Sequence, residues 1–164
     1  IMKAIKLIPP DKILKWINYW PPYLISGIKV KRVWNDGLSI QVAMDQYSWN
    51  TNYVGSHFGG SLYSMCDPFY MFILLNKIGK DHIVWDKSAD IEFVRPAVGK
   101  VTALFEISEI EIEKIKDKAL KEFSFIWFFN ARVLDKENNI VANVKKGLYI
   151  RRKDAKERFK TKSQ

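Results

Sequence analysis

The stretch Gly59–Leu75 constrains the fold of this chain more than any other feature, because it has helical apolar spacing and is apolar nearly all round. A helix on a protein surface carries a polar face, so a helix of this composition must be buried. It is short for a membrane span, and Ser61, Ser64, Asp67 and Pro68 interrupt it. The sequence therefore predicts a central helix that other elements of the same domain cover.

One charged residue, Asp67, lies inside this predicted helix and is followed by Pro68. Pro68 has no N–H for the carbonyl of Ser64, so the helix should bend or break there. Asp followed by Pro is also the pattern of an N-cap and first helical residue, which would give Asp67 only a capping role. The apolar spacing continues through the pair and favours one bent helix. Ser61, Ser64 and Asp67 then form a polar stripe, which needs polar partners because unpaired burial costs about 1–3 kcal/mol per group.

Strand patterns flank the predicted helix on both sides. A segment at about 11–20 has helical spacing and ends at Pro21, and two runs joined by a turn at Asn35–Gly37 form a predicted hairpin. Four extended runs follow, at roughly 88–94, 100–109, 120–134 and 140–150. The run FSFIWFF alternates poorly and is interpreted as a strand buried on both faces. We expect an α+β fold in one domain, 1–150: a long central helix wrapped by a curved antiparallel sheet, with an extra N-terminal helix and a basic tail, 151–164.

The net charge of +9 is concentrated in that tail. Residues 151–164 contribute +5 and the body +4, so the body is not a basic platform. A nucleic-acid or membrane-surface protein therefore depends on the tail alone. The single cysteine, Cys66, cannot form an internal disulfide, and the N-terminus has no signal-peptide pattern, so a reducing, cytoplasmic location is expected.

Three positions around the helix have the spacing of a known family. Asn52 precedes the adjacent Gly59 and Gly60 by seven positions, and Asp67 follows Gly59 by eight. With IEFVRPAVGKV at 91–101, this resembles the hotdog-fold acyl-CoA thioesterases of the phenylacetic-acid-degradation type. The resemblance covers roughly residues 26–150. It is closest to a subgroup with the signatures FGGSLYSMCDPF and VWDK.

The resemblance implies a hotdog fold and a catalytic site. In the family, the N–H at the position of Gly59 polarises the thioester carbonyl, and the carboxylate at Asp67 acts as general base or nucleophile. Both roles suit the residues, since glycine permits close approach and an apolar surround raises a carboxyl pKa. Asn52 would orient substrate or water, with an ordinary turn-forming Asn as the alternative.

The remaining candidates for substrate binding are Gly60, Phe58, His57, Ser64, Asp86 and Lys87. Family enzymes commonly place His directly before the glycine pair, where this chain has Phe58. His57 is one position earlier, an offset of about 100° on a helix, so we expect a surface or capping histidine. Asp86 or Lys87 would replace a Ser or Thr that positions water in some members, with simple surface polarity as the alternative.

Three functions stay open. The first is hydrolysis of an acyl thioester, with coenzyme A as part of the substrate and no other cofactor. The second is a catalytically silent hotdog protein that binds an acyl chain or acyl-CoA, which Phe58 favours. The third is the nucleic-acid or membrane-surface protein. No metal site is predicted, because His57, His82 and Cys66 lack ligand spacing, and Cys66 is interpreted as an inert core thiol. The resemblance implies a homodimer or dimer of dimers, a homotetramer, with sites shared between subunits.

Overall fold

The computed structural model describes residue 14 and residues 16–154. The predicted helix at 11–20 lies partly outside this range, although Leu14, Trp16 and Ile17 are helical. A separate helix, α2 (Pro21–Ser26), begins where the sequence predicted a stop. Two prolines suit its first turn, where the missing N–H groups have no helical acceptor, so here proline starts a helix rather than ending one. Residues 155–164 of the basic tail lie outside the described range.

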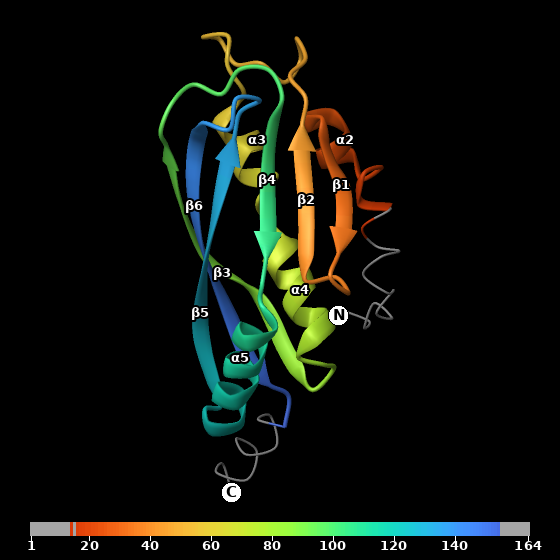
Figure 1. Ribbon diagram of the computed structural model, residues 1–164, viewed down its shortest axis with the longest axis vertical. Coiled ribbons are helices and arrows are strands. Elements are labelled where there is room, and N and C mark those ends of the chain that lie inside the picture. The colour runs from red at the N-terminus through yellow and green to blue at the C-terminus, as the bar shows by residue number, and fades with distance from the viewer. Residues whose placement is uncertain (1–13, 15, 155–164) are drawn as a thin grey trace, which may run out of the picture.

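A six-stranded antiparallel sheet forms the frame of the molecule, in the order β1-β2-β4-β5-β6-β3 (Figure 1). Its strands are β1 (Ile28–Trp34), β2 (Ser39–Met44), β3 (His82–Phe93), β4 (Val101–Glu106), β5 (Ser124–Leu134) and β6 (Ile140–Arg152). Gly37, with φ 81°, helps to close the predicted hairpin between β1 and β2. β1 begins at Ile28 because the preceding residues belong to α2. β6 runs past residue 150, so the sheet extends two residues into the predicted tail.

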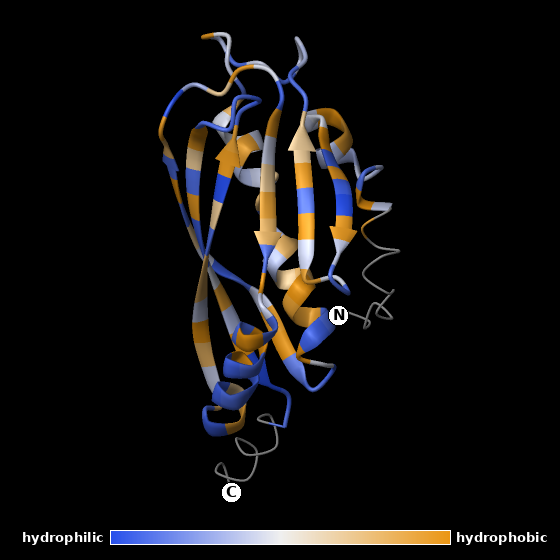
Figure 2. Cartoon of the chain, in the orientation of Figure 1, coloured by the Kyte–Doolittle hydropathy of each residue, from blue (hydrophilic) through white to orange (hydrophobic). Residues whose placement is uncertain are grey.

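The predicted central helix is two helices, α3 (Gly59–Ser64) and α4 (Phe69–Lys77), which follow one path along the face of the sheet behind it in Figure 1. Leu62, Phe69 and Leu74 are buried against the strands. Hydropathy varies along the strands (Figure 2), and burial alternates along β4 and along much of β5. The expected burial of the central helix is confirmed, and the interruption at Pro68 is a break rather than a bend.

Aromatic side chains pack α4 onto the sheet. The ring centroids of Phe69 and Phe105 of β4 are 5.0 Å apart, and those of Tyr70 and Phe129 of β5 are 4.6 Å apart, both in stacked geometry. The opposite face of β5 differs from the prediction of a strand buried on both sides, because Ile126 is 41% exposed and Phe128 is 51% exposed. In this chain β5 alternates between the core and an open outer face.

One helix was missed entirely from the sequence. Helix α5 (Glu109–Lys121) covers one end of the sheet. The sequence had predicted extended runs up to residue 109 and from residue 120, with no helix between them. Ser108 caps α5 by accepting a hydrogen bond from the Glu111 N–H, and Ile112 and Ile115 face the core. The Ser-x-x-Glu pattern of a capping box was present as a signal. Helix α5 therefore separates β4 from β5 in the chain.

The α+β arrangement predicted from the sequence is confirmed, with one central helical rod enclosed by a curved antiparallel sheet. Among the described residues, no helix is long and apolar enough to cross a bilayer.

Candidate active site

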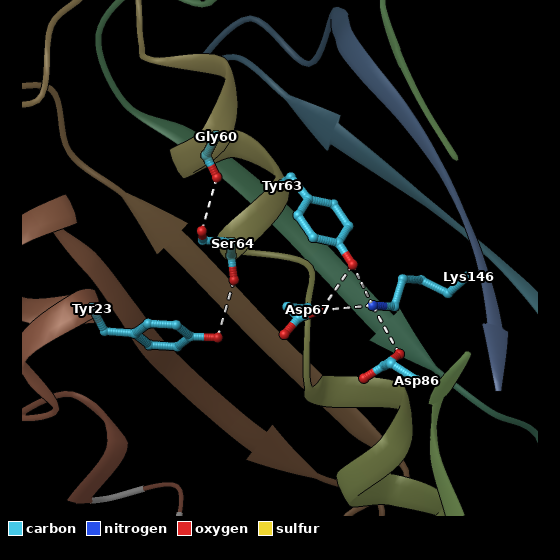
Figure 3. Close-up of polar contacts among 7 residues, drawn as sticks. All are labelled: Tyr23, Gly60, Tyr63, Ser64, Asp67, Asp86 and Lys146. Atoms are coloured by element: carbon cyan, nitrogen blue, oxygen red, sulfur yellow. Dashed lines mark hydrogen bonds and ion pairs between the residues drawn. The ribbon is translucent and has the colours of Figure 1, made fainter. Parts of the chain in front are cut away.

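Asp67 lies in the break between α3 and α4. The N-cap position of α4 is Pro68, and no side chain caps that helix. A helix does begin just after Asp67, but the Asp67 side chain does not cap it, so the N-cap alternative is wrong. The carboxylate turns instead towards Tyr63 and Lys146 (Figure 3). A residue placed between two helices has its side chain free for contacts with the sheet.

The polar stripe is only partly the one expected. The Ser64 hydroxyl donates back to the carbonyl of Gly60 at 2.8 Å, so it serves the helix rather than a substrate (Figure 3). The Ser64 carbonyl accepts a hydrogen bond from Tyr23 on α2. Of this stripe, Asp67 alone joins the charged cluster of Tyr63, Asp86 and Lys146.

Lys146 on β6 is the centre of this cluster, and its side chain is fully buried. Its Nζ lies 2.8 Å from Asp67 Oδ1, 2.8 Å from Asp86 Oδ1 and 3.0 Å from the Tyr63 hydroxyl (Figure 3). The ammonium donates hydrogen bonds to Asp67 Oδ1 and to the Tyr63 hydroxyl, and its contact with Asp86 is an ion pair. Tyr63 in turn donates to Asp67 Oδ1 at 2.9 Å. Two donors thus hold Oδ1, whereas Oδ2 has no hydrogen-bond partner within the described range.

The environment of the carboxylates corrects one expectation. An apolar surround was expected for Asp67, but its side chain is 47% exposed and pairs with an ammonium group. Burial raises the pKa of Asp86 against the opposing effect of Lys146. For Lys146, burial lowers the pKa, but its interactions with the carboxylates of Asp67 and Asp86 outweigh burial, and the net shift of the pKa is upward. The cluster therefore holds a permanent cation at neutral pH.

A β-bulge directs Asp86 into this cluster. Asp86 pairs with Leu148 and Ser88 with Gly147, so Lys87 is the extra residue in β3. Asp86 consequently faces the helices, while Lys87 is exposed and forms no ion pair among the described residues. Of the two candidates in the VWDK segment, the structure brings only Asp86 to Asp67.

Lys146 was missed in the sequence. Its signal was its place in the alternation of β6, in which Val144, Lys146, Leu148 and Ile150 share the inward face. A lysine in an apolar register needs an anionic partner, because isolated buried charges are costly. The identity of that partner depends on strand pairing, which the pattern of β6 does not reveal.

Asp67 lines an apolar groove of 620 Å³ between the N-terminal segment and α4. The residues around it are Trp16, Ile17, Tyr19, Trp20, Pro21, Asp67, Pro68 and Phe72. The only ionisable carboxyl in this lining is that of Asp67. The volume lies within the range of about 300–1,000 Å³ typical of small-molecule sites. The arrangement places one carboxylate beside a surface suited to an apolar group.

A second pocket, of 430 Å³, lies at the start of α3 and is lined in part by Asn52, His57, Gly59 and Phe93. The N–H groups of Gly59 and Gly60 have no acceptor among the described residues. Contrary to the predicted surface histidine, His57 is buried. Its Nε2 lies 2.6 Å from the Gly99 carbonyl, which requires a proton on that nitrogen, and its Nδ1 has no partner in the described part of the chain.

Asn52 is committed to its own loop. Its amide donates to the Ser56 hydroxyl and the His57 carbonyl, and its oxygen accepts from the N–H groups of Val54 and Ser56. These are the contacts of a turn-forming Asn. Phe58 does not line the pocket, because its ring lies against Gly60, where an added Cβ would be 2.4 Å from Phe58 Cε1. Gly60 thus accommodates Phe58.

The structure therefore divides the predicted site into two groups. Asp67 and Asp86 meet at Lys146, whereas Asn52, His57 and Gly59 surround the other pocket. The two pockets have no lining residue in common. No cluster of three or more His, Cys, Asp or Glu suited to a metal occurs among the described residues. Cys66 is buried, and burial raises its pKa to about 12, which agrees with an inert core thiol.

Comparison with known proteins places the chain in a family. The model of a family described as a domain of unknown function, DUF4442, matches residues 12–150. No curated protein matches the chain. The Pseudomonas aeruginosa protein PA5026, of unknown function and described as a probable thioesterase, has a similar structure, with a TM-score of 0.77 and 16% identity over 88% of this chain and 97% of that one.

Two further solved structures share the fold. The thioesterase HI1161 of Haemophilus influenzae has a TM-score of 0.64 at 13% identity, over 90% of this chain and 93% of its own. A variant of the thioesterase PA1618 of Pseudomonas aeruginosa has a TM-score of 0.62 at 11% identity, over 90% and 97%. At these identities the likeness shows the hotdog fold alone. The narrower subgroup with the FGGSLYSMCDPF and VWDK signatures stays a prediction.

Proposed function

This chain belongs to the DUF4442 family, and we propose that it uses the hotdog fold to hydrolyse an acyl thioester, such as an acyl-CoA, at Asp67. One observation carries the proposal. Oδ1 of Asp67 is anchored by Tyr63 and Lys146, while Oδ2 is left without a partner in the described range, on a residue that lines an apolar groove. A reactive carboxylate needs this combination of a fixed position and a free oxygen.

The chemistry would proceed by one of two routes. As general base, Oδ2 takes a proton from water, the water oxygen attacks the thioester carbon, and the C–S bond breaks to release a thiolate that is then protonated. As nucleophile, Oδ2 attacks the carbon itself, expels the thiolate and forms a mixed anhydride that water hydrolyses. The acyl group would lie against Trp20, Pro68 and Phe72 in the groove.

The oxyanion donor in this proposal is the N–H of Gly59, which has no acceptor among the described residues. Gly59 and Asp67 line separate pockets within one chain. We therefore propose a homodimer, or a dimer of dimers, in which Gly59 of one subunit and Asp67 of the other complete a site. β3 supplies an open sheet edge for such pairing, since β6 is its only neighbour among the strands of the described residues.

A second candidate function is that of a silent hotdog protein that binds an acyl chain or acyl-CoA. Lys146 favours it, because an ammonium group 2.8 Å from Asp67 Oδ1 also fits a carboxylate whose role is a structural ion pair. Phe58 in place of the usual His points the same way. Binding without turnover needs the groove but not the free oxygen.

Asp67→Asn separates the two. The amide keeps the shape and one accepting oxygen but loses charge and basicity, so thiol release from a panel of acyl-CoAs should fall about 100-fold or more. Thermal stabilisation by the same acyl-CoAs should persist. Asp117→Asn, on an exposed position of α5, is the matched control and should leave the rate unchanged.

Equal rates for Asp67→Asn and the parent would refute the catalytic assignment. A parent that releases no thiol from any acyl-CoA, yet is stabilised by one of them, would establish the silent binding protein instead.

A further inference from the structure

A fully buried lysine between two carboxylates is the feature that the proposed reaction does not by itself require. Lys146 has no exposed side-chain surface, and its ammonium group donates hydrogen bonds to Asp67 and Tyr63 and forms an ion pair with Asp86. Replacing a buried ion pair with apolar residues is often neutral or stabilising, so such a pair is weak evidence of a role in stability. A role in the neighbouring carboxylate fits the geometry better.

The contacts of Lys146 act on one oxygen of Asp67. Lys146 and Tyr63 both donate to Oδ1, from the sheet and from α3 respectively, which fixes the plane of the carboxylate and leaves Oδ2 free (Figure 3). Asp86 Oδ1, on β3, lies 2.8 Å from the same ammonium. Asp86 thus holds Lys146 from the opposite strand and keeps it from rotating away.

We propose that Lys146, held by Asp86, is a positioning residue that fixes the orientation of the Asp67 carboxylate, so that Oδ2 is available to the substrate. In kinetic terms this rests on the proposed hydrolase function. In structural terms it is a statement about the orientation of the Asp67 carboxylate, which can be determined without turnover.

The charges around Asp67 are few. The titratable groups that face it are Tyr63 on α3, Tyr23 on α2, Asp86 on β3, Lys146 on β6 and the adjacent Cys66. With both carboxylates ionised the cluster carries −1. Lys146 is its only cation, since no other ion pair to Asp67 or Asp86 occurs among the described residues.

Three variants separate charge from positioning. Lys146→Met leaves two carboxylates with no cation, and like charges at close range make one of them retain a proton to higher pH. Lys146→Met combined with Asp86→Asn restores the net charge of −1 without the anchor on Oδ1. Lys145→Met is the matched control, because Lys145 is the adjacent residue but points outward over the Phe128 ring.

We would measure kcat/KM for acyl-CoA hydrolysis from pH 5 to 9 and determine the crystal structure of each variant. In Lys146→Met the two carboxylates repel each other and Oδ1 loses a donor, so kcat/KM should fall at least about 10-fold and its acidic limb should move to higher pH. The double variant should recover the acidic limb of the parent, yet stay several-fold slower because Oδ1 still lacks its anchor. Lys145→Met should match the parent in rate and pH profile.

A folded Lys146→Met with the rate and pH profile of the control would overturn the proposal. Should Lys146→Met fail to fold, the charge-balanced double variant decides, and a parental rate in it would overturn the positioning role. Should the parent hydrolyse no thioester, the proposed function fails separately, and the crystal structures of the variants still test the positioning role: an Asp67 carboxylate in its parental orientation without Lys146 would overturn it.

Discussion

The hydroxyl of Tyr23 donates a hydrogen bond of 3.1 Å to the main-chain carbonyl of Ser64, which is the carbonyl that Pro68 cannot serve. In an uninterrupted helix the N–H four residues later would bond this oxygen. Its other contact is a weaker one at 3.3 Å from the Asp67 N–H. Helix α2 therefore stabilises the break that carries Asp67, so the N-terminal segment takes part in the candidate site.

Tyr23→Phe should lower the free energy of unfolding by about 1–2 kcal/mol, because a buried carbonyl loses its better donor while the ring remains. Urea unfolding followed by circular dichroism measures this. Tyr19→Phe, on an exposed ring, is the control and should change stability by less than about 0.5 kcal/mol. Equal stability of the two variants would show that the Tyr23 hydrogen bond does not hold the break.

Gly59→Pro tests the oxyanion donor in the proposed hydrolase. Proline removes the N–H at the first position of α3, where the helix does not use it, and Phe58 already has the extended conformation that a residue before proline requires. We expect kcat to fall about 100-fold or more. Gly59→Ala keeps the N–H and adds a Cβ that would lie 3.0 Å from the Phe93 ring, so it controls for crowding. Similar losses in both variants would assign the effect to crowding.

Stability should fall as the pH rises above about 9. Burial raises the pKa of the Cys66 thiol from 9.0 to about 12, and it also raises the pKa of Tyr23 and Tyr70 above 10.0. The pKa of Lys146 is also raised, by its carboxylate partners. In all four, the folded state holds a proton that the unfolded state releases, so the stability is complete below pH 9 and is lost as the pH rises.

Urea unfolding at pH 8, 9, 10 and 11 measures this slope. Tyr70→Phe removes one of the four groups and should make the decline above pH 10 shallower by about 1.4 kcal/mol per pH unit. A stability that is flat from pH 8 to 11 would contradict the role of these groups.

Light scattering should show a homodimer or dimer of dimers at micromolar concentration rather than a monomer of 19.2 kDa. If the open edge of β3 makes the contact, Ala89→Lys on that strand should weaken association, because lysine on an edge strand opposes pairing. Gln41→Lys, exposed on the interior strand β2, should not. A monomeric parent would remove the model of a site shared between subunits.

Local sequence signals determined much of this molecule. The apolar run around Leu62 and Phe69 predicts burial on all sides, and Pro68 removes a helical hydrogen bond wherever the chain folds. The spacing of Asn52, Gly59 and Asp67 supported the resemblance that implied a hotdog fold, and it could be recognised because these residues are near one another in the chain. Helix α5 was missed although Ser108 and Glu111 carried its capping signal, since Ile110 and Ile112 alternate with glutamates, which is the period of a strand.

The partners of Asp67 were decided by tertiary structure. Lys146 lies 79 positions away in sequence and reaches Asp67 because β6 packs over the helix break, and the bulge at Lys87 directs Asp86 to the same ammonium. His57 likewise is buried because its ring meets the Gly99 carbonyl from another loop. Sequence patterns report which face of an element a side chain occupies. The charge that it meets there depends on strand order and register, which bring distant residues within hydrogen-bonding distance.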